Sequence, residues 1–471
     1  MTQSEASARK IRESLDHPVL DADGHIVEYW PELDRFLREE GVEGGMEAFM
    51  ATANFDGSRT WQTLEPEERL RERAYRSPWW GFPNDARDLA TAVAPRLLYE
   101  RLDELGIDLA VCYPSVGLQL PAQRDERVRR LGCRAYNRYA ARHFEGLSDR
   151  MLPVAVVPTC DPAEALEELD YAVEELGFRA VMIGGFAPRQ FGPEEEHGFW
   201  IDSLALDSLH DYDPLWKRLV ELRVAPTLHS GSMGWSGRRS ISNFSYNHMG
   251  NFAGAGEATA KSMFFGGVFH RFPELRVGFL EGGVTWAVQM LVGLVEHWEK
   301  RGPEGLRDLD PAGMDAALFD RLVEEHAGAL RTVDGFGGQM AKALGGSEVF
   351  NDFAAAGIES PADIVRQITT QCFFGCEADD PLAGLAFDTR RLPGGTPLCP
   401  IFSSDIGHWD VAHMHEVLPE AHEHVEKGWM DAAQFRAFMC DNAVRMYCQA
   451  NPEFFAGTVI EDYAAGRAGV S

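Results

Sequence analysis

The sequence has little of what marks a secreted or membrane-spanning protein. It holds eight cysteines among 471 residues, none of them in a CxxC pair, which is typical of reduced thiols in the cytosol. No apolar run approaches the roughly 20 residues of a membrane span. The polar N-terminal stretch also lacks the apolar centre of a signal peptide. We therefore expect a cytoplasmic protein that does not bind membranes.

Basic residues are scarce as well. The chain has 44 Lys and Arg against 74 Asp and Glu, a formal net charge of -30. Nucleic acids and anionic membranes are bound by clustered basic side chains, so neither is an expected partner. The chain also lacks GxGxxG after a strand, GxxxxGK[ST] and GxSxG, which excludes the usual nucleotide and serine-hydrolase sites. A small-molecule substrate remains.

Short apolar runs rich in Val, Ile and Phe recur along the chain, separated by segments of helical periodicity. Continuously apolar strands that alternate with helices predict a parallel sheet covered on both faces. The count of the runs favours an α/β fold of the (β/α)8 TIM-barrel type with helical insertions; an open doubly wound sheet is the alternative. The runs lie at 18–23, 107–114, 152–158, 179–184, 224–229, 275–281, 371–377 and 399–405.

Two of the intervening helices have recognisable ends. Asp161 and Pro162 are predicted as the N-cap and first helical residue of a helix that Gly177 closes, and Asp213 with Pro214 as the start of another. Cys372 and Cys376 lie within an apolar strand, where buried packing is the simpler interpretation than a metal pair.

We divide the chain into three parts. Residues 1–17 form an N-terminal extension, 18–450 the barrel domain and 451–471 a C-terminal tail. Two connections, at about 31–95 and 301–370, are too long for ordinary loops. Long connections in compact domains are usually lids or functional loops.

Ligand-type side chains follow four of the apolar runs. Asp23 and His25 end the first run in PVLDADGHIVEYW, His229 the fifth, Glu281 the sixth and Asp405 the eighth. In a barrel these ends converge on one face, where barrel enzymes keep their active sites. Imidazole and carboxylate without thiolate suit Zn²⁺, Mn²⁺ or Fe²⁺. The sequence therefore predicts that one divalent metal ion binds here.

Each of these residues also has a simpler interpretation. Asp23 could cap a turn before Gly24, Asp405 could be the N-cap of the next helix, and either histidine could be a hydrogen-bonded core residue. The joint pattern at four strand ends favours the metal site.

Several motifs are informative in their order and spacing. They are LDADGHIVE, LDELGIDLAVCYPS, CRAYNRYAARHFEGLSDRMLPVAVVPTCDP, YDPLWKRLVELRVAPTLHSG, FFGGVFHRFPELRVGFLEGGVTW, IFSSDIGHWD and DNAVRMY. In these motifs the chain resembles the amidohydrolase-related metal-dependent enzymes of the aminocarboxymuconate-semialdehyde decarboxylase type, a branch of the amidohydrolase superfamily. The resemblance runs from about residue 18 to 448, interrupted by the two long connections.

The resemblance implies a mononuclear metal site and a TIM barrel. By position, the family's ligands fall on Asp23, His25, His229 and Asp405. The first motif departs from the family's two-histidine form, and Glu281 stands where many decarboxylases carry a histidine. The resemblance also implies a homodimer or higher homo-oligomer.

Two reactions fit such a site. In the first, a small aromatic or cyclic acid loses carbon dioxide without an oxidant, with Asp405, His248 or His408 as the proton donor. In the second, an amide, lactone or similar carbonyl is hydrolysed, with Asp405 or Glu281 as the base. A non-catalytic barrel that acts as a metal-binding or assembly scaffold is the third interpretation.

The remaining candidates are substrate contacts. Arg238 and Arg239 could pair with a substrate carboxylate, and Trp409 could line a pocket for a flat substrate. A solvated loop is the alternative for the two arginines. Four further tryptophans could line the same substrate pocket: Trp79, Trp80, Trp235 and Trp286.

Overall fold

The structure is a computed structural model of the chain. It describes residues 3–52, 61, 63–76, 84–191, 199–229, 239–310, 313–326, 351–408 and 411–467.

Eight parallel strands form the central sheet, in the order β1-β2-β3-β4-β7-β8-β9-β10. All eight predicted runs are therefore confirmed as strands, with ends that differ by up to three residues. The strands are buried along nearly their whole length, as a sheet covered on both faces requires. Their bounds are β1 Leu20–Ile26, β2 Leu109–Pro114, β3 Met151–Val157, β4 Ala180–Ile183, β7 Pro226–Leu228, β8 Val277–Phe279, β9 Cys372–Glu377 and β10 Pro400–Ser403.

The first and last strands meet through backbone hydrogen bonds at their carboxyl ends. The His25 N–H donates to the Ile406 carbonyl at 2.7 Å, and the Asp405 N–H donates to the Asp23 carbonyl at 3.2 Å. The sheet thus returns on itself as a nearly closed barrel, which confirms the predicted TIM barrel and excludes the open doubly wound sheet.

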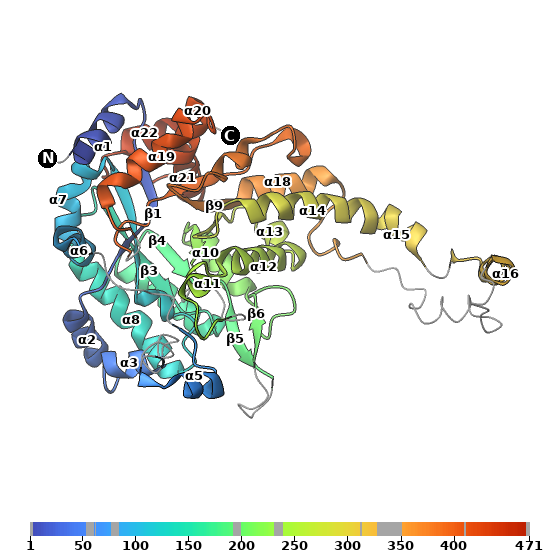
Figure 1. Cartoon of the computed structure of the whole chain (residues 1–471), viewed down its shortest axis with the longest axis horizontal. Helices are drawn as coiled ribbons and strands as arrows, with labels where there is room; N and C mark the ends of the chain where they lie inside the picture. Colours follow the sequence, from blue (N-terminus) through green and yellow to red (C-terminus); the bar gives the residue numbers. More distant parts are fainter. Residues whose placement is uncertain are drawn as a thin grey trace.

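Helices surround the strands (Figure 1). Each covering helix buries one apolar stripe against the barrel, as an amphipathic helix does. The covering helices are α8 Glu126–His143, α9 Pro162–Asp170, α10 Asp213–Glu221, α12 Phe252–Phe265, α13 Val268–Arg271, α14 Thr285–Arg301, α18 Pro361–Gln371, α19 Val417–Glu426, α20 Ala432–Arg436 and α21 Asn442–Ala450.

The long connection after β1 is mainly helical. It carries α2 Trp30–Glu39, α3 Met46–Thr52, α5 Pro66–Glu72 and α6 Ala86–Val93, and α7 Pro95–Leu105 leads into β2. After β8, α14 continues into α15 Pro303–Leu309. Together with α16 Ala316–His326 these helices reach away from the barrel (Figure 1).

One small sheet was not predicted. β5 Ala187–Gln190 and β6 Phe199–Asp202 form an antiparallel pair that leaves the barrel after β4. Its short, half-exposed strands carry no continuous apolar run, so the pattern that identified the barrel strands could not find it.

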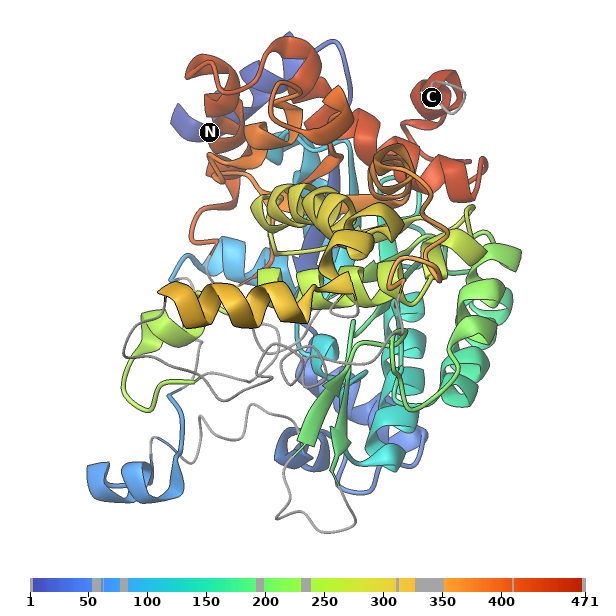
Figure 2. The same cartoon turned by 90° about the vertical axis from the view of Figure 1, so that its right-hand side faces the viewer.

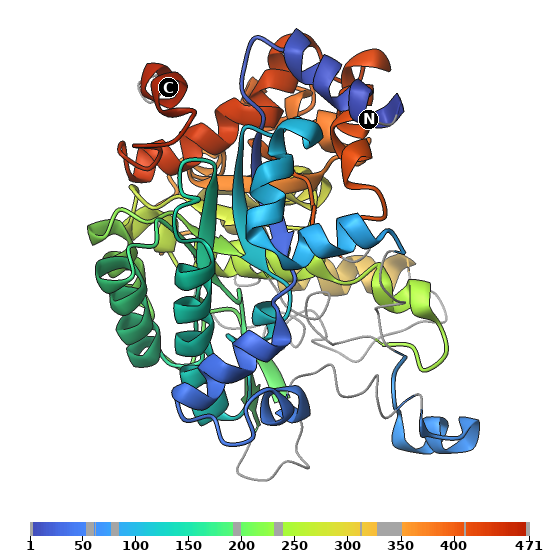
Figure 3. The ribbon, with the colours of Figure 1, turned by 90° about the vertical axis from the view of Figure 1, so that its left-hand side faces the viewer.

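Both ends of the described chain lie at the same end of the barrel, on opposite sides of it (Figures 2 and 3). α1 Gln3–Ser14 buries Ala8, and its Arg12 makes a bidentate ion pair with Asp108 just before β2. α22 Glu461–Arg467 is joined to the helix layer by the Tyr463 hydroxyl, which donates to Asp441. None of the helices in the described ranges is long and apolar enough to cross a membrane.

The two predicted helix starts fared differently. Asp161 caps α9 as predicted: its carboxylate accepts the Ala163 N–H in a capping box. Asp213 was wrongly predicted as an N-cap. Tyr212 holds that position in α10, and the Asp213 carboxylate binds the Arg271 guanidinium instead.

Candidate metal centre

Asp23, His25 and His229 form a fully buried cluster at the carboxyl ends of β1 and β7. One ligand atom of each lies within 4.8 Å of the others. His25 Nε2 is 3.5 Å from Asp23 Oδ1, and His229 Nε2 is 3.9 Å from the same oxygen. Three of the four predicted ligands are thus brought together by two strands that do not neighbour each other in the sheet.

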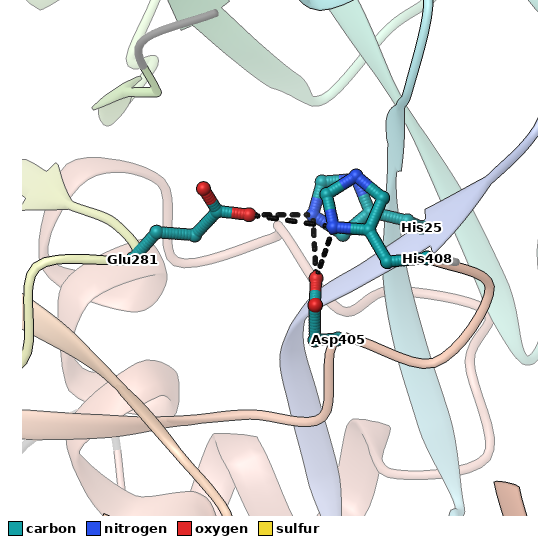
Figure 4. Close-up of side chains that lie close together, drawn as sticks. All are labelled: His25, Glu281, Asp405 and His408. Atoms are coloured by element: carbon teal, nitrogen blue, oxygen red, sulfur yellow. Dashed lines mark ion pairs between the residues drawn. The ribbon is translucent and has the colours of Figure 1, made fainter. Parts of the chain in front are cut away.

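Glu281, Asp405 and His408 lie beside the same imidazole (Figure 4). Asp405 Oδ1 lies 3.4 Å from His25 Nε2 and 2.5 Å from His408 Nδ1. Glu281 Oε1 lies 3.3 Å from His229 Nε2 and 3.7 Å from His25 Nε2. The structure therefore places the fourth predicted ligand and two of the predicted catalytic residues around one point.

The last residue of β2, Pro114, fixes the orientation of His25. Its Nδ1–H donates to the Pro114 carbonyl at 2.9 Å. The proton on Nδ1 leaves the lone pair on Nε2, the nitrogen that faces the carboxylates. Such a backbone contact is the usual way in which a metal-binding histidine is held.

Several buried oxygen and nitrogen atoms of the cluster have no hydrogen-bond partner among the described residues. These atoms are both carboxylate oxygens of Asp23, His25 Nε2 and both ring nitrogens of His229. Leaving a charged oxygen buried without a partner is costly. A divalent cation would satisfy the carboxylate oxygens and imidazole nitrogens at once, so these residues fit the predicted metal.

The cluster is also an electrostatically coupled group. Burial opposes protonation of His25, but Asp23 and Glu281 outweigh it and raise the pKa of the imidazole. Burial alone would raise the pKa of Glu281. The imidazoles of His229, His408 and His25 outweigh that effect and lower this pKa to about 2. Glu281 is therefore ionised at neutral pH.

Glu281 and Asp405 share an uncommon backbone conformation. Their φ angles are 55° and 52°, in the left-handed region that residues other than glycine rarely adopt. Each such residue costs on the order of 1 to 3 kcal/mol, and such residues gather at functional sites. The left-handed turn after the strand lets each carboxylate turn back over the end of the barrel, which no sequence pattern indicated.

Two other acidic residues of this stretch, Asp21 in β1 and Glu28 just after it, do not face the cluster. Asp21 and Glu28 are buried, but neither belongs to the metal-type groups of the described chain. The metal-type groups thus include Asp23 and His25 of this stretch but not Asp21 and Glu28. Both hold neighbouring strand ends instead.

The remaining predicted site residues have separate positions. His248 ends α11 Phe244–His248 and stacks on Phe244, and neither metal-type group includes it. Arg239 stacks over the Tyr75 ring at 4.0 Å. Trp286 packs in the core against Phe279 and Phe374, which leaves it no place in a pocket wall.

The other substrate-contact predictions lie outside the described residues: Arg238, Trp409, Trp79, Trp80 and Trp235. Cys372 and Cys376 are both buried in β9, and burial raises the pKa of each thiol, which suits packing rather than metal binding.

Sequence comparison relates the chain to a family model and to curated proteins. Residues 115–329 match the sequence model of the amidohydrolase family. The decarboxylase orsB of Emericella nidulans is 30% identical over 190 residues, which is 36% of this chain and 51% of the relative. The chain thus matches about half the length of this curated relative.

Solved structures share the fold. An amidohydrolase from Mycobacterium avium subsp. paratuberculosis superposes with a TM-score of 0.52 and 16% identity, covering 92% of this chain and 100% of that one. The 5-carboxyvanillate decarboxylase of Sphingomonas paucimobilis gives a TM-score of 0.50 and 13% identity, covering 92% and 99%. These structures share the (β/α)8 barrel, and the match of residues 115–329 to the amidohydrolase family model confirms the predicted resemblance.

Proposed function

We propose that this protein is a divalent-metal-dependent enzyme that removes carbon dioxide from a small aromatic or cyclic acid without an oxidant. The metal dependence is supported by the buried group of Asp23, His25 and His229. Carboxylate oxygens and imidazole nitrogens of this group lack hydrogen-bond partners in the described chain. Similarity to a decarboxylase over 190 residues supports the lyase reaction.

In this proposal Asp23, His25, His229 and Asp405 hold one Zn²⁺, Mn²⁺ or Fe²⁺ ion. A bound ion of this kind would supply a Lewis acid that polarises substrate oxygens. The four side chains come from three strands of the rigid barrel, so their mutual geometry is set before substrate arrives.

His408 is the proton donor that we favour. It is 5% exposed, and its Nδ1 lies 2.5 Å from Asp405 Oδ1, so the carboxylate orients the ring and stabilises its protonated form. The proton passes to the substrate carbon that bears the carboxylate. The bond between that carbon and the carboxylate breaks, and carbon dioxide leaves.

Arg239 is the candidate that would bind a substrate carboxylate. Burial lowers its pKa, and no carboxylate of the described residues lies within 4.0 Å of its guanidinium. In a chain of net charge -30, a half-buried arginine without an acidic neighbour in the described ranges suits an anionic ligand.

Hydrolysis of an amide, lactone or similar carbonyl is the second candidate. The carboxylate of Glu281 favours it, because an ionised acid 3.3 Å from His229 Nε2 suits a general base better than a proton donor. We also propose that the protein acts in the cytoplasm, as a homodimer or higher homo-oligomer. The free state of all eight cysteines supports the location.

Elemental analysis of the purified chain tests the metal dependence. One divalent ion per chain is expected. The loaded protein is then assayed for carbon dioxide release from hydroxybenzoates and for hydrolysis of amides and lactones. Release of carbon dioxide supports the lyase, and hydrolysis alone supports the second candidate. No bound ion, even after reconstitution with zinc, manganese and iron, would reject both and leave the scaffold interpretation.

A further inference from the structure

Two carboxylates on either side of the metal ligands hold the barrel ends that carry those ligands. Asp21 lies in β1 and Glu28 just after it, and each is 1% exposed. We propose that both are positioning residues of the metal centre: Asp21 sets the place of Asp405, and Glu28 sets the orientation of His25. The inference rests on the proposed metal-dependent function and extends it.

Asp21 clamps the turn that carries Asp405. Its Oδ1 accepts the Ser404 N–H at 3.0 Å and its Oδ2 accepts the Ser404 hydroxyl at 2.6 Å. The Ser404 Oγ in turn accepts the Ile406 N–H at 3.0 Å. Asp405 lies between these two residues in the strained left-handed conformation, so the turn on both sides of it is tied to β1.

Glu28 clamps the loop that orients His25. Its Oε2 accepts the Val116 N–H at 2.9 Å and its Oε1 accepts the Gly117 N–H at 2.8 Å. These amides follow Pro114, whose carbonyl accepts the His25 Nδ1–H at 2.9 Å. Both carboxylate oxygens therefore hold the short loop whose first carbonyl fixes the imidazole.

The hydrogen bonds of Asp21 and Glu28 explain why carboxylates are needed there. A carboxylate only accepts hydrogen bonds, and each of these two receives bonds on both oxygens. An amide of the same shape would turn one NH2 toward a donor and lose that contact. A merely structural role would lower stability alone, whereas a positioning role also weakens metal binding.

Glu28→Gln tests the contact between Glu28 and the loop after β2. Asp202→Asn is its control. Asp202 is also fully buried and accepts the Leu204 N–H, the Ser208 hydroxyl and the Arg189 guanidinium, but it lies in the β5–β6 hairpin. Dissociation constants for Co²⁺ and Zn²⁺ and the absorption spectrum of the Co²⁺ protein are measured beside the melting temperature. We expect Glu28→Gln to weaken metal binding about 10-fold or more, with a changed spectrum. Asp202→Asn should lower only the melting temperature.

Ser404→Ala tests the contact between Asp21 and the turn that carries Asp405. It leaves both carboxylates in place, so the test stays valid if Asp21→Asn fails to fold. Ser403→Ala is the matched control. Its hydroxyl is as buried as that of Ser404 but makes no hydrogen bond within the described chain. We expect weaker metal binding, by about 10-fold, in Ser404→Ala alone.

The outcomes separate this inference from the proposed function. Wild-type affinity and spectrum in both Glu28→Gln and Ser404→Ala, with a lowered melting temperature, would overturn the positioning role and leave the metal centre intact. Absence of metal binding in the wild type would instead reject the proposed function itself.

Discussion

The imidazole rings of His25 and His408 stack face to face, with centroids 3.7 Å apart and an interplanar angle of 12°. They come from opposite ends of the sequence, and the barrel closure between β1 and the turn after β10 brings them together. His25 Nε2 and His408 Nδ1 face the same two carboxylates, Asp405 and Glu281 (Figure 4). A nitrogen suited to bind a cation thus lies beside one suited to carry a proton.

His229→Ala should abolish stoichiometric metal binding while the barrel still folds. The variant removes one of the three buried side chains of the cluster of Asp23, His25 and His229. Inductively coupled plasma mass spectrometry measures the bound ion. His297→Ala is the control, since among the described residues that imidazole bonds only within α14, to the Gly293 carbonyl. Equal metal content in the two variants would remove His229 from the site.

His408→Gln should keep one metal ion per chain and lose activity by about 10² to 10⁴-fold, the usual contribution of a general acid. The physical reason is that glutamine can fill the space beside Asp405 but cannot carry a transferable proton. Steady-state rates and metal content are measured on the same preparation. Loss of the ion in this variant would make His408 a ligand instead.

Glu281→Gly should be more stable than Glu281→Ala by about 1 kcal/mol. Both variants lose the carboxylate, but only glycine adopts the φ of 55° without strain. Urea unfolding of the metal-free proteins gives the difference. Equal or lower stability of the glycine variant would show that the left-handed conformation at Glu281 stores no strain.

Gly407→Ala should destabilise the protein by about 3 kcal/mol or more. A Cβ at this position, where φ is 99°, would overlap the His25 carbonyl oxygen, and that backbone cannot move without opening the barrel closure. Gly177→Ala is the control, since φ there is 76° but a Cβ meets nothing within 4 Å. Denaturant unfolding should give Gly177→Ala only the conformational cost, about 1 to 2 kcal/mol.

Stability should fall as pH rises from about 4.5 toward 7, and Glu168 should be one cause. Burial raises the pKa of this carboxyl to about 7, although Asn137 and Arg134 bond to it. In that interval the folded state holds a proton that the unfolded state has lost, so a rising pH favours unfolding. The cost should reach about 3 kcal/mol near pH 7 and then stay constant.

Glu168→Gln removes this titration. Free energies of unfolding from urea titrations between pH 4.5 and 8 should therefore agree near pH 4.5, separate progressively up to about pH 7 and stay apart above it, with the variant the more stable. Parallel curves for the two proteins across the whole interval would contradict the raised pKa of Glu168.

The sequence by itself determined the strands and the ligand types at their ends. A strand buried on both faces has to be apolar along its length, so eight such runs are visible without a structure, and Asp23, His25, His229 and Asp405 stand out as polar residues where those runs stop. The short β5–β6 hairpin carries no such pattern and was missed.

Only the tertiary structure decided which polar residues share a site. Asp21, Asp23 and Glu28 are the same kind of side chain within eight positions of one another, yet Asp23 faces His229 while the other two bind the ends of β10 and β2. Their directions depend on barrel closure and on loops far along the chain. For the same reason the stack of His408 on His25 and the left-handed turns at Glu281 and Asp405 have no local signal: they exist because long-range backbone contacts hold strand ends at fixed distances.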